Sequence, residues 1–228
     1  MELLSSVADV LMPRFCMVCG RRLSIGERNV CVACTLKMPL MKYRQGEFNA
    51  TEQLLVSELE LVRAASYMSY YKESNYSRIL YHLKYYGHPD VGFQLSRNAA
   101  LQLDREHFFD GIDMIVPVPL SRRKYRKRGY NQCDYIAAGI SDVTGIPVRN
   151  DIVRRNLSNS AQARKGLFQR WDNAVNLFGV SDRDALQGRH VLLVDDVITT
   201  GATLSSLIDT MSAAADIRVS VFTLAIAR

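Results

Sequence analysis

One segment restricts the possible folds of this chain more than any other: VLLVDDVITTGAT, residues 191–203. Its four apolar residues followed by two carboxylates predict a buried strand with acids at its carboxyl end, which is where open α/β sheets bind ligands. The loop after it consists of small residues and opens a predicted helix, so its amides and hydroxyls can surround a phosphate. That loop comprises Thr199, Thr200, Gly201, Ala202 and Thr203. We therefore expect a strand–loop–helix unit with a phosphate site at the start of the helix.

The two acids in this segment, Asp195 and Asp196, indicate what else the ligand contains. Both carboxylates would repel a phosphate, so we expect them to face neutral hydroxyls or a metal ion. A sugar that carries adjacent hydroxyls and a 5-phosphate satisfies the acids and the loop together. The alternative is a strand–turn–helix unit in which the acids only cap the turn. The loop lacks the lysine of a P-loop and the three glycines of a dinucleotide-binding loop, which excludes both of those sites.

The rest of the chain alternates apolar strand-like segments with helical ones. Strands are expected at 114–120, 190–196 and 219–227, with a strand pair or edge strand at 61–71. Helices are expected in two parts between 75 and 103, at 131–143, and from the 199–203 loop to about residue 214. This order favours an α/β fold with a mostly parallel sheet flanked by helices. Residues 35–60 are expected to form a linker, and residues 156–170 a polar mobile loop.

The composition agrees with a globular protein, because 48% of the 228 residues are hydrophobic and 23% are charged. These proportions exclude a disordered or collagen-like chain. No stretch approaches the ~20 apolar residues that a transmembrane helix needs. The N-terminal segment contains Asp9 and lacks the basic start of a signal peptide, so we expect a short amphipathic helix that ends at Pro13. We therefore expect the protein to be cytoplasmic.

Four of the five cysteines form two CxxC pairs that are separated by eleven residues. They are Cys16, Cys19, Cys31 and Cys34. In a reducing cytoplasm such thiols stay reduced, and four thiolates complete a closed tetrahedral zinc shell. Gly20 permits a tight turn after the first pair, while redox chemistry and two disulfides remain the alternatives. We expect a small zinc knuckle in an N-terminal module at residues 1–45, followed by the main domain at residues 46–228.

Residues 122–128, RRKYRKR, place six basic side chains in seven positions without an acid. The net charge of the whole chain is +6, which is weak support for an anionic partner. We expect an exposed basic loop that binds phosphates, either of a nucleotide or of nucleic acid. The alternative is a solvated basic surface without a ligand. Cys133 follows in a helical segment and is expected to be a small, semi-buried apolar residue.

Several segments, in order along almost the whole chain, resemble the ComF family, whose members join a four-cysteine knuckle to a domain similar to type I phosphoribosyltransferases. They are CMVCG and CVAC around the cysteine pairs, HLKYYG at 82–87, VPVPLSRRKYRKRGYNQ at 116–132 and QARKGLFQRWDNAVNLF at 162–178. Residues 191–203 look like the signature with which type I phosphoribosyltransferases bind phosphoribosyl pyrophosphate (PRPP). The resemblance implies a type I phosphoribosyltransferase-like fold.

The resemblance also implies a role for each segment. Asp195 and Asp196 would contact the 2- and 3-hydroxyls of the PRPP ribose, and the 199–203 loop would hold its 5-phosphate. Four arginines would hold the pyrophosphate: Arg122, Arg123, Arg126 and Arg128. Arg164 and Lys165 would be the catalytic residues, because they lie where a loop of the transferases closes over the reacting centre and stabilises departing pyrophosphate. Magnesium would bind pyrophosphate and ribose oxygens through few protein ligands.

The resemblance leaves two functions. The first is a competence or DNA-utilisation protein that binds PRPP or a nucleotide, with single-stranded DNA and a helicase-like DNA-uptake protein as further partners. The alternative is an active phosphoribosyltransferase of nucleotide salvage or synthesis that transfers phosphoribose to an unidentified nucleophile. Six cations exceed what one diphosphate can accept. Lys124 and Lys127, expected to lie furthest from the turn, are therefore predicted to contact DNA and to matter little for PRPP.

Overall fold

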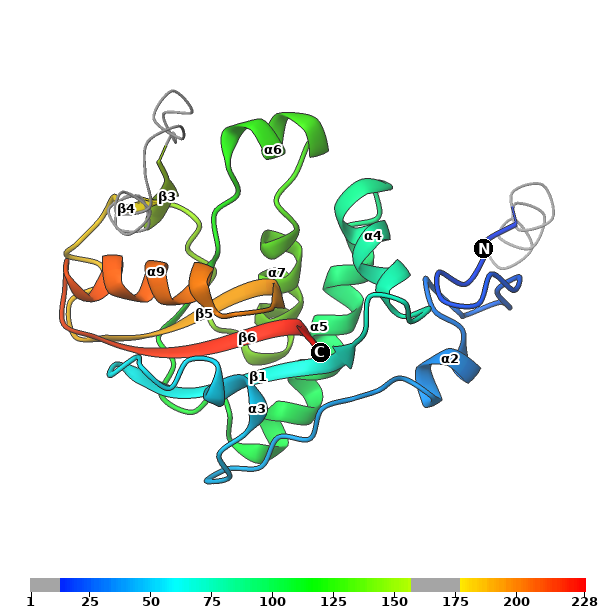
Figure 1. Ribbon diagram of the computed structural model, residues 1–228, viewed down its shortest axis with the longest axis horizontal. Helices are drawn as coiled ribbons and strands as arrows, with labels where there is room; N and C mark the ends of the chain where they lie inside the picture. The colour runs from blue at the N-terminus through cyan, green and yellow to red at the C-terminus, as the bar shows by residue number, and fades with distance from the viewer. Residues whose placement is uncertain (1–12, 157–176) are drawn as a thin grey trace.

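The computed structural model describes residues 13–156 and 177–228, and Figure 1 shows their arrangement. The helix expected before Pro13 lies outside the described residues. The same holds for nearly all of the loop expected at 156–170, including Arg164 and Lys165. Within the described ranges, no helix is both long and apolar enough to cross a bilayer.

A four-stranded parallel sheet forms the centre of the molecule (Figure 1). In the order in which they lie side by side, its strands are β1 (Leu61–Tyr70), β6 (Ile217–Ala227), β5 (Arg189–Ile198) and β2 (Met114–Pro117). Each neighbouring pair in this sheet runs parallel. This confirms the predicted α/β fold with a mostly parallel sheet. A separate antiparallel pair, β3 (Val153–Arg155) and β4 (Phe178–Val180), lies on either side of residues 157–176 in the sequence.

Helices cover both faces of this sheet. They are α4 (Ser77–Tyr85), α5 (Asp90–Leu103) with a 3₁₀ turn at Asp104–Glu106, α7 (Gln132–Thr144) and α9 (Ala202–Ser212). Successive strand residues point to opposite faces. Leu192 and Val194 of β5 pack in one apolar cluster with residues of α4, α5 and α7. Val191 and Leu193 pack in a second cluster with residues of α9. All four are fully buried, as expected for a central parallel strand.

The basic run forms a helix, α6 (Arg122–Arg128), so the prediction of a loop was wrong. The Ser121 hydroxyl accepts a hydrogen bond from the Lys124 amide at 3.4 Å and begins the helix. Gly129 ends it with a φ of +84°, which favours glycine. Arginine and lysine are good helix formers, and cations in the last turn face the negative end of the helix dipole. Because water surrounds the exposed side chains, their mutual repulsion does not prevent the helix.

The segment expected to be a linker, residues 35–60, covers the outer edge of the sheet. It contains the short helix α3 (Ala50–Gln53), and the Met41 amide donates a hydrogen bond to the Tyr67 carbonyl of β1 at 2.8 Å. β1 is therefore a single edge strand. This confirms one of the two alternatives predicted for residues 61–71, and the other, a strand pair, was wrong. Covering this edge prevents it from pairing with another chain.

Residues 14–37, here called the cysteine module, contain α2 (Val32–Leu36) and lie beside α4 at one end of the molecule (Figure 1). Cys16, Met17 and Val18 of the module belong to the same apolar cluster as residues of α4 and α5. The cysteine module and the main domain therefore share a core, although the boundary at residues 45 and 46 stays a prediction.

Candidate functional site

Asp195, Asp196 and one residue of the predicted phosphate loop, Thr203, line one cavity at the carboxyl ends of β2 and β5. Its volume is about 500 Å³, and residues from α4, α6, α7, β3 and β5 line it. Its charged lining residues are Lys84, Lys124, Lys127, Arg128, Arg155, Asp195 and Asp196. A cavity that combines five cations with two carboxylates can bind an anion that also carries hydroxyl groups.

Asp195 is held at the end of β5 by short-range hydrogen bonds. Its Oδ1 accepts a hydrogen bond from the Asp196 amide at 2.8 Å and another from the Cys133 thiol at 3.4 Å. Loss of hydration around the carboxyl, followed by the charge of Asp196, raises the pKa of Asp195 to about 7. Near neutral pH this carboxyl can therefore either donate or accept a proton in a hydrogen bond to a ligand hydroxyl.

Cys133 is fully buried against Asp195, deeper than the semi-buried position that its sequence context predicted. Burial, followed by the charges of Asp195 and Asp196, raises the pKa of the Cys133 thiol well above its usual value. The thiol is therefore protonated at neutral pH and acts as a hydrogen-bond donor in the cavity wall.

Asp196 is buried and forms an ion pair with a lysine from another element. The Lys84 Nζ of α4 lies 3.0 Å from Asp196 Oδ1. Burial alone would lower the pKa of Lys84, but the charge and hydrogen bond of Asp196 raise it above its usual value. The second oxygen, Asp196 Oδ2, is buried and has no hydrogen-bond partner among the described residues. Because a buried carboxylate oxygen without a partner is costly, this atom indicates where a ligand hydroxyl or cation would bind.

The 199–203 loop joins β5 to α9 in the way the sequence predicted. Gly201 has a φ of +80°, and a Cβ at this position would lie 2.7 Å from the Leu54 carbonyl oxygen, so glycine is required. Thr203 lines the cavity, whereas Thr199, Thr200 and Ala202 are exposed. The amides of the first turn of α9 have no partner within the helix, which makes its start suitable for a phosphate.

The helical period of α6 divides its cations between two sides. Lys124, Lys127 and Arg128, spaced by three and four residues, line the cavity. Arg128 also donates a hydrogen bond to Gln132, and its guanidinium lies 5.6 Å from the centre of the Tyr85 ring. The other three arginines predicted to hold pyrophosphate are exposed, and the described lining of the cavity does not include them. They are Arg122, Arg123 and Arg126.

Four further residues line this cavity without having been predicted from the sequence: Lys84, Tyr85, Gln132 and Arg155. Two of them lie in the HLKYYG segment, where a lysine among aromatic residues was a signal for Lys84. Gln132 ends the 116–132 segment, whose resemblance to a known family was a signal, whereas Arg155 of the short strand β3 had none.

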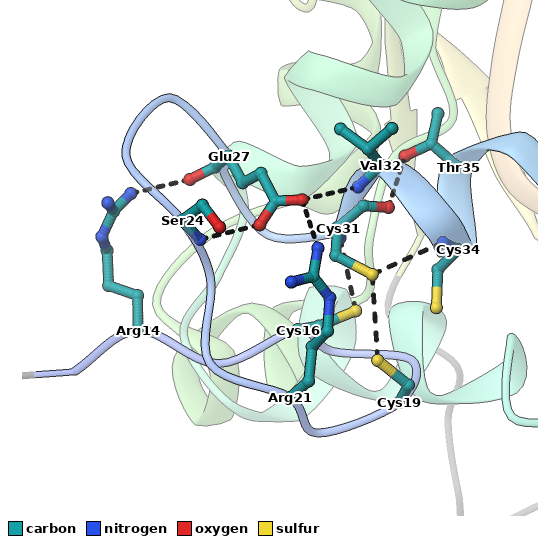
Figure 2. Close-up of polar contacts among 10 residues, drawn as sticks. All are labelled: Arg14, Cys16, Cys19, Arg21, Ser24, Glu27, Cys31, Val32, Cys34 and Thr35. Carbon is teal, nitrogen blue, oxygen red and sulfur yellow. Dashed lines mark hydrogen bonds and ion pairs between the residues drawn. The ribbon is translucent and has the colours of Figure 1, made fainter.

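The four module cysteines converge as predicted, and Figure 2 shows them with their polar contacts. Their sulfur atoms all lie within 4.8 Å of one another, and the Cys19 and Cys31 sulfurs are 3.8 Å apart. Four sulfurs at 2.3 Å from a tetrahedral zinc ion would stand about 3.8 Å apart. The thiols are free, so the alternative of two disulfides is not what the structure shows. The cluster could hold a metal such as zinc.

Surrounding groups favour a thiolate at Cys31, whereas burial and the neighbouring sulfurs raise the pKa of Cys34 above its usual value. The Cys31 amide donates to the Cys16 sulfur at 3.4 Å, and the Cys34 amide donates to the Cys31 sulfur at the same distance. Burial alone would raise the pKa of Cys31, but hydrogen bonds from Arg21 and from its neighbours lower it to about 6.

The loop between the two cysteine pairs is closed by Glu27, whose carboxylate accepts hydrogen bonds from the Ser24 and Val32 amides (Figure 2). A loop fixed in this way orients the ligands around a metal.

Comparison with known proteins finds relatives, although no protein-family model matches the chain. DNA utilization protein YhgH of Escherichia coli K12 is 26% identical over 205 residues, which cover 86% of this chain and 89% of that protein. Competence protein F of Haemophilus influenzae is 36% identical over 110 residues, 48% of each chain. Competence protein ComFC of Bacillus subtilis is 32% identical over 91 residues, 40% of this chain and 35% of that protein.

Solved structures similar to this chain include a hypoxanthine phosphoribosyl transferase of Trypanosoma cruzi, at 12% identity and a TM-score of 0.39, covering 60% of this chain and 74% of that one. An allosteric regulatory enzyme of purine biosynthesis is 18% identical with a TM-score of 0.39, and the match covers 57% of this chain and 26% of that one. The curated relatives and the clustered thiols agree with the resemblance stated from the motifs. The chain is a homologue of the YhgH, competence F and ComFC proteins.

Proposed function

We propose that the cavity binds PRPP, or a nucleotide with the same ribose and phosphate groups, and that the protein uses this ligand in DNA utilisation. The observation that carries the proposal is the buried carboxylate of Asp196. One of its oxygens is paired with Lys84, and the other has no partner among the described residues. A sugar hydroxyl supplies the hydrogen bond that this oxygen lacks.

Each part of PRPP has a matching group in the cavity. Asp195 and Asp196 would bind the two ribose hydroxyls, and the 199–203 loop at the start of α9 would bind the 5-phosphate. We assign the diphosphate to Lys124, Lys127 and Arg128, because these cations of α6 line the cavity. This assignment replaces the sequence-based expectation that the two lysines matter little for PRPP.

Two metal ions belong to the proposal. We propose that the cysteine module holds one structural zinc ion, since the sulfur separations suit four thiolates around zinc. Magnesium would reach the cavity with the ligand, bound mainly to diphosphate oxygens. Asp196 Oδ2 offers one further oxygen, while Lys84 already neutralises the other side of this carboxylate.

Calorimetric titration with PRPP and magnesium tests the proposal. Asp195→Asn combined with Asp196→Asn removes two charge-assisted hydrogen bonds worth about 1.5–3 kcal/mol each, so we expect the affinity to fall about 100-fold or more. Asp209→Asn with Asp216→Asn makes the same charge change at exposed positions and should leave the affinity unchanged. Equal affinities of the two double variants, or no binding by the native protein, would refute the proposed ligand.

The alternative function is an active phosphoribosyltransferase. It adds to PRPP binding the transfer of phosphoribose to a nucleophile, with release of pyrophosphate. Arg164 and Lys165 stay predicted catalytic residues in this alternative. A screen of bases and other nucleophiles for pyrophosphate release from PRPP distinguishes a transferase from a protein that only binds.

Single-stranded DNA is the second ligand that we propose, and the cations outside the cavity support it. Arg122, Arg123 and Arg126 are exposed, and Tyr125 between them is 50% exposed. Cations interleaved with an exposed aromatic ring suit a phosphate backbone and a stacked base. A helicase-like partner and a cytoplasmic location stay predictions.

A further inference from the structure

We propose that Lys84 is a positioning residue that couples the cysteine module to the carboxylate pair of the cavity. The inference rests on the proposed sugar-phosphate ligand, but it also has a consequence in the free protein. Lys84 belongs to α4, which lies between the cysteine module and α6 (Figure 1). One helix therefore contacts the module near its start and the cavity near its end.

The contact with the module is made before and within the first turn of α4. The Tyr76 hydroxyl donates to the Cys34 carbonyl at 2.9 Å, and Arg78 donates to the Val18 carbonyl at 3.3 Å. Both acceptors are backbone groups of the cysteine module, and Cys34 is itself one of the four clustered thiols. Metal binding in the module fixes the position of these carbonyls, and so it fixes the start of α4.

The contact with the cavity is made in the last turn. The Lys84 Nζ lies 3.0 Å from Asp196 Oδ1, and the lysine side chain is 25% exposed. The cavity lining also contains Cys133 of α7, Arg155 of β3 and the cations of α6. Among these, the Lys84 amine is the cation with a described ion pair to Asp196.

This ion pair orients the carboxylate pair. Asp195 and Asp196 follow one another on β5, and without a cation their charges oppose each other. Lys84 binds Oδ1 of Asp196, which leaves Oδ2 for a ligand hydroxyl. Lys84 thus sets the ribose site without belonging to the 191–203 segment.

The helix transmits displacement from one contact to the other. Tyr76 and Lys84 are eight positions apart, about 12 Å along a helix axis. A hydrogen-bonded helix of this length moves as a unit, so displacement of its start shifts Lys84 relative to β5. Because coupling is reciprocal, anything that anchors Lys84 also stabilises the module.

The first test measures binding of ribose 5-phosphate in magnesium-free buffer, since this probe has the adjacent hydroxyls and the 5-phosphate but no diphosphate. Lys84→Met should lower its affinity at least 10-fold, and Lys84→Arg should keep it within about 3-fold of the native value. Lys72→Met is the matched control, because Lys72 is an exposed lysine in the segment just before α4. Unchanged affinity in Lys84→Met, when the native protein binds the probe, overturns the inference.

The second test measures the coupling itself. Tyr76→Phe with Arg78→Met removes both hydrogen bonds to the module and leaves the four cysteines in place. It should weaken ribose 5-phosphate binding several-fold in the native background and not in the Lys84→Met background. The same loss in both backgrounds would show that the helix start affects the cavity independently of Lys84, and would overturn the inference.

The third test needs no ligand. Zinc release to a chromophoric chelator should be several-fold faster in Lys84→Met than in the native protein, and unchanged in Lys72→Met. If the native protein binds neither ribose 5-phosphate nor PRPP, yet Lys84→Met accelerates release, the proposed function fails and the coupling stands. If the native protein binds PRPP and Lys84→Met changes neither affinity nor release, the coupling fails and the proposed function stands.

Discussion

At the scale of single residues, burying the carboxyl of Asp195 in the ligand cavity lowers the stability of the folded protein near neutral pH. Its pKa is raised from the ordinary aspartate range to about 7, first by loss of hydration and then by the charge of Asp196. The folded protein therefore holds a proton that the unfolded chain releases near pH 4. Between these two values the unfolded state binds fewer protons, so stability falls as the pH rises from about 4 to about 7.

The first prediction follows from this decrease in stability with rising pH. The side chain introduced by Asp195→Asn cannot ionise. The difference in free energy of unfolding, variant minus native protein, should therefore be larger at pH 8 than at pH 5. The free energy of unfolding should gain about 1 kcal/mol or more, because a pKa shift of even one unit is worth about 1.4 kcal/mol. Urea unfolding at the two pH values measures it, with Asp209→Asn as the control. The same difference between variant and native protein at both pH values would contradict the raised pKa.

At the scale of elements, α6 separates the two proposed ligands by its geometry. A helix repeats every 3.6 residues, so a run of six cations cannot point in one direction. Lys124, Lys127 and Arg128 line the cavity, whereas Arg122, Arg123 and Arg126 lie outside its described lining. A diphosphate and a DNA backbone can thus use different sides of one helix.

The second prediction compares two pairs of substitutions in α6. Lys124→Ala with Lys127→Ala should weaken PRPP binding about 10-fold or more, because two charged contacts to the diphosphate are lost. Arg123→Ala with Arg126→Ala should leave PRPP affinity within about 2-fold. This second pair should reduce the slope of log affinity against log salt for single-stranded DNA by about 0.7 per lost contact. Calorimetry and a salt series of fluorescence anisotropy measure the two effects, and equal effects of both pairs on both ligands would contradict the division.

At the scale of the whole molecule, one apolar cluster joins the cysteine module to the helices of the main domain. Buried residues of the module, such as Cys16 and Val18, belong to the same cluster as Leu83 of α4 and Leu95 of α5. Unfolding of the module would expose part of this shared core. The two predicted segments, 1–45 and 46–228, should therefore unfold together.

The third prediction is a single thermal transition that depends on the metal. Removal of zinc should lower the midpoint of unfolding by about 10 °C or more, since 1 kcal/mol shifts a protein of this size by about 2–4 °C and structural zinc contributes several kcal/mol. Differential scanning calorimetry with and without a chelator measures the shift, and adding zinc back should restore it. A main transition that does not move, or two separate transitions, would indicate an independent module.

The sequence by itself determined the features whose physical cause is local. The apolar run, the acids and the small-residue loop at 191–203 are consecutive, so a strand, a ligand edge and a helix start could be predicted from neighbouring residues. The CxxC pairs likewise predicted the sulfur cluster, because each pair is one turn. The prediction of a loop was wrong at α6, because a basic run indicates only exposure, while the caps at Ser121 and Gly129 define a helix.

Only the tertiary structure decided which distant residues complete the site. The contact of Lys84 with Asp196 depends on how α4 packs beside the sheet, and no local pattern in HLKYYG specifies that partner. The contribution of Arg155 depends on a short strand outside the main sheet. The side of α6 that faces the cavity depends on the angle at which the helix leaves β2. Packing between elements that are far apart in the chain sets all three, and that is information a linear sequence pattern does not contain.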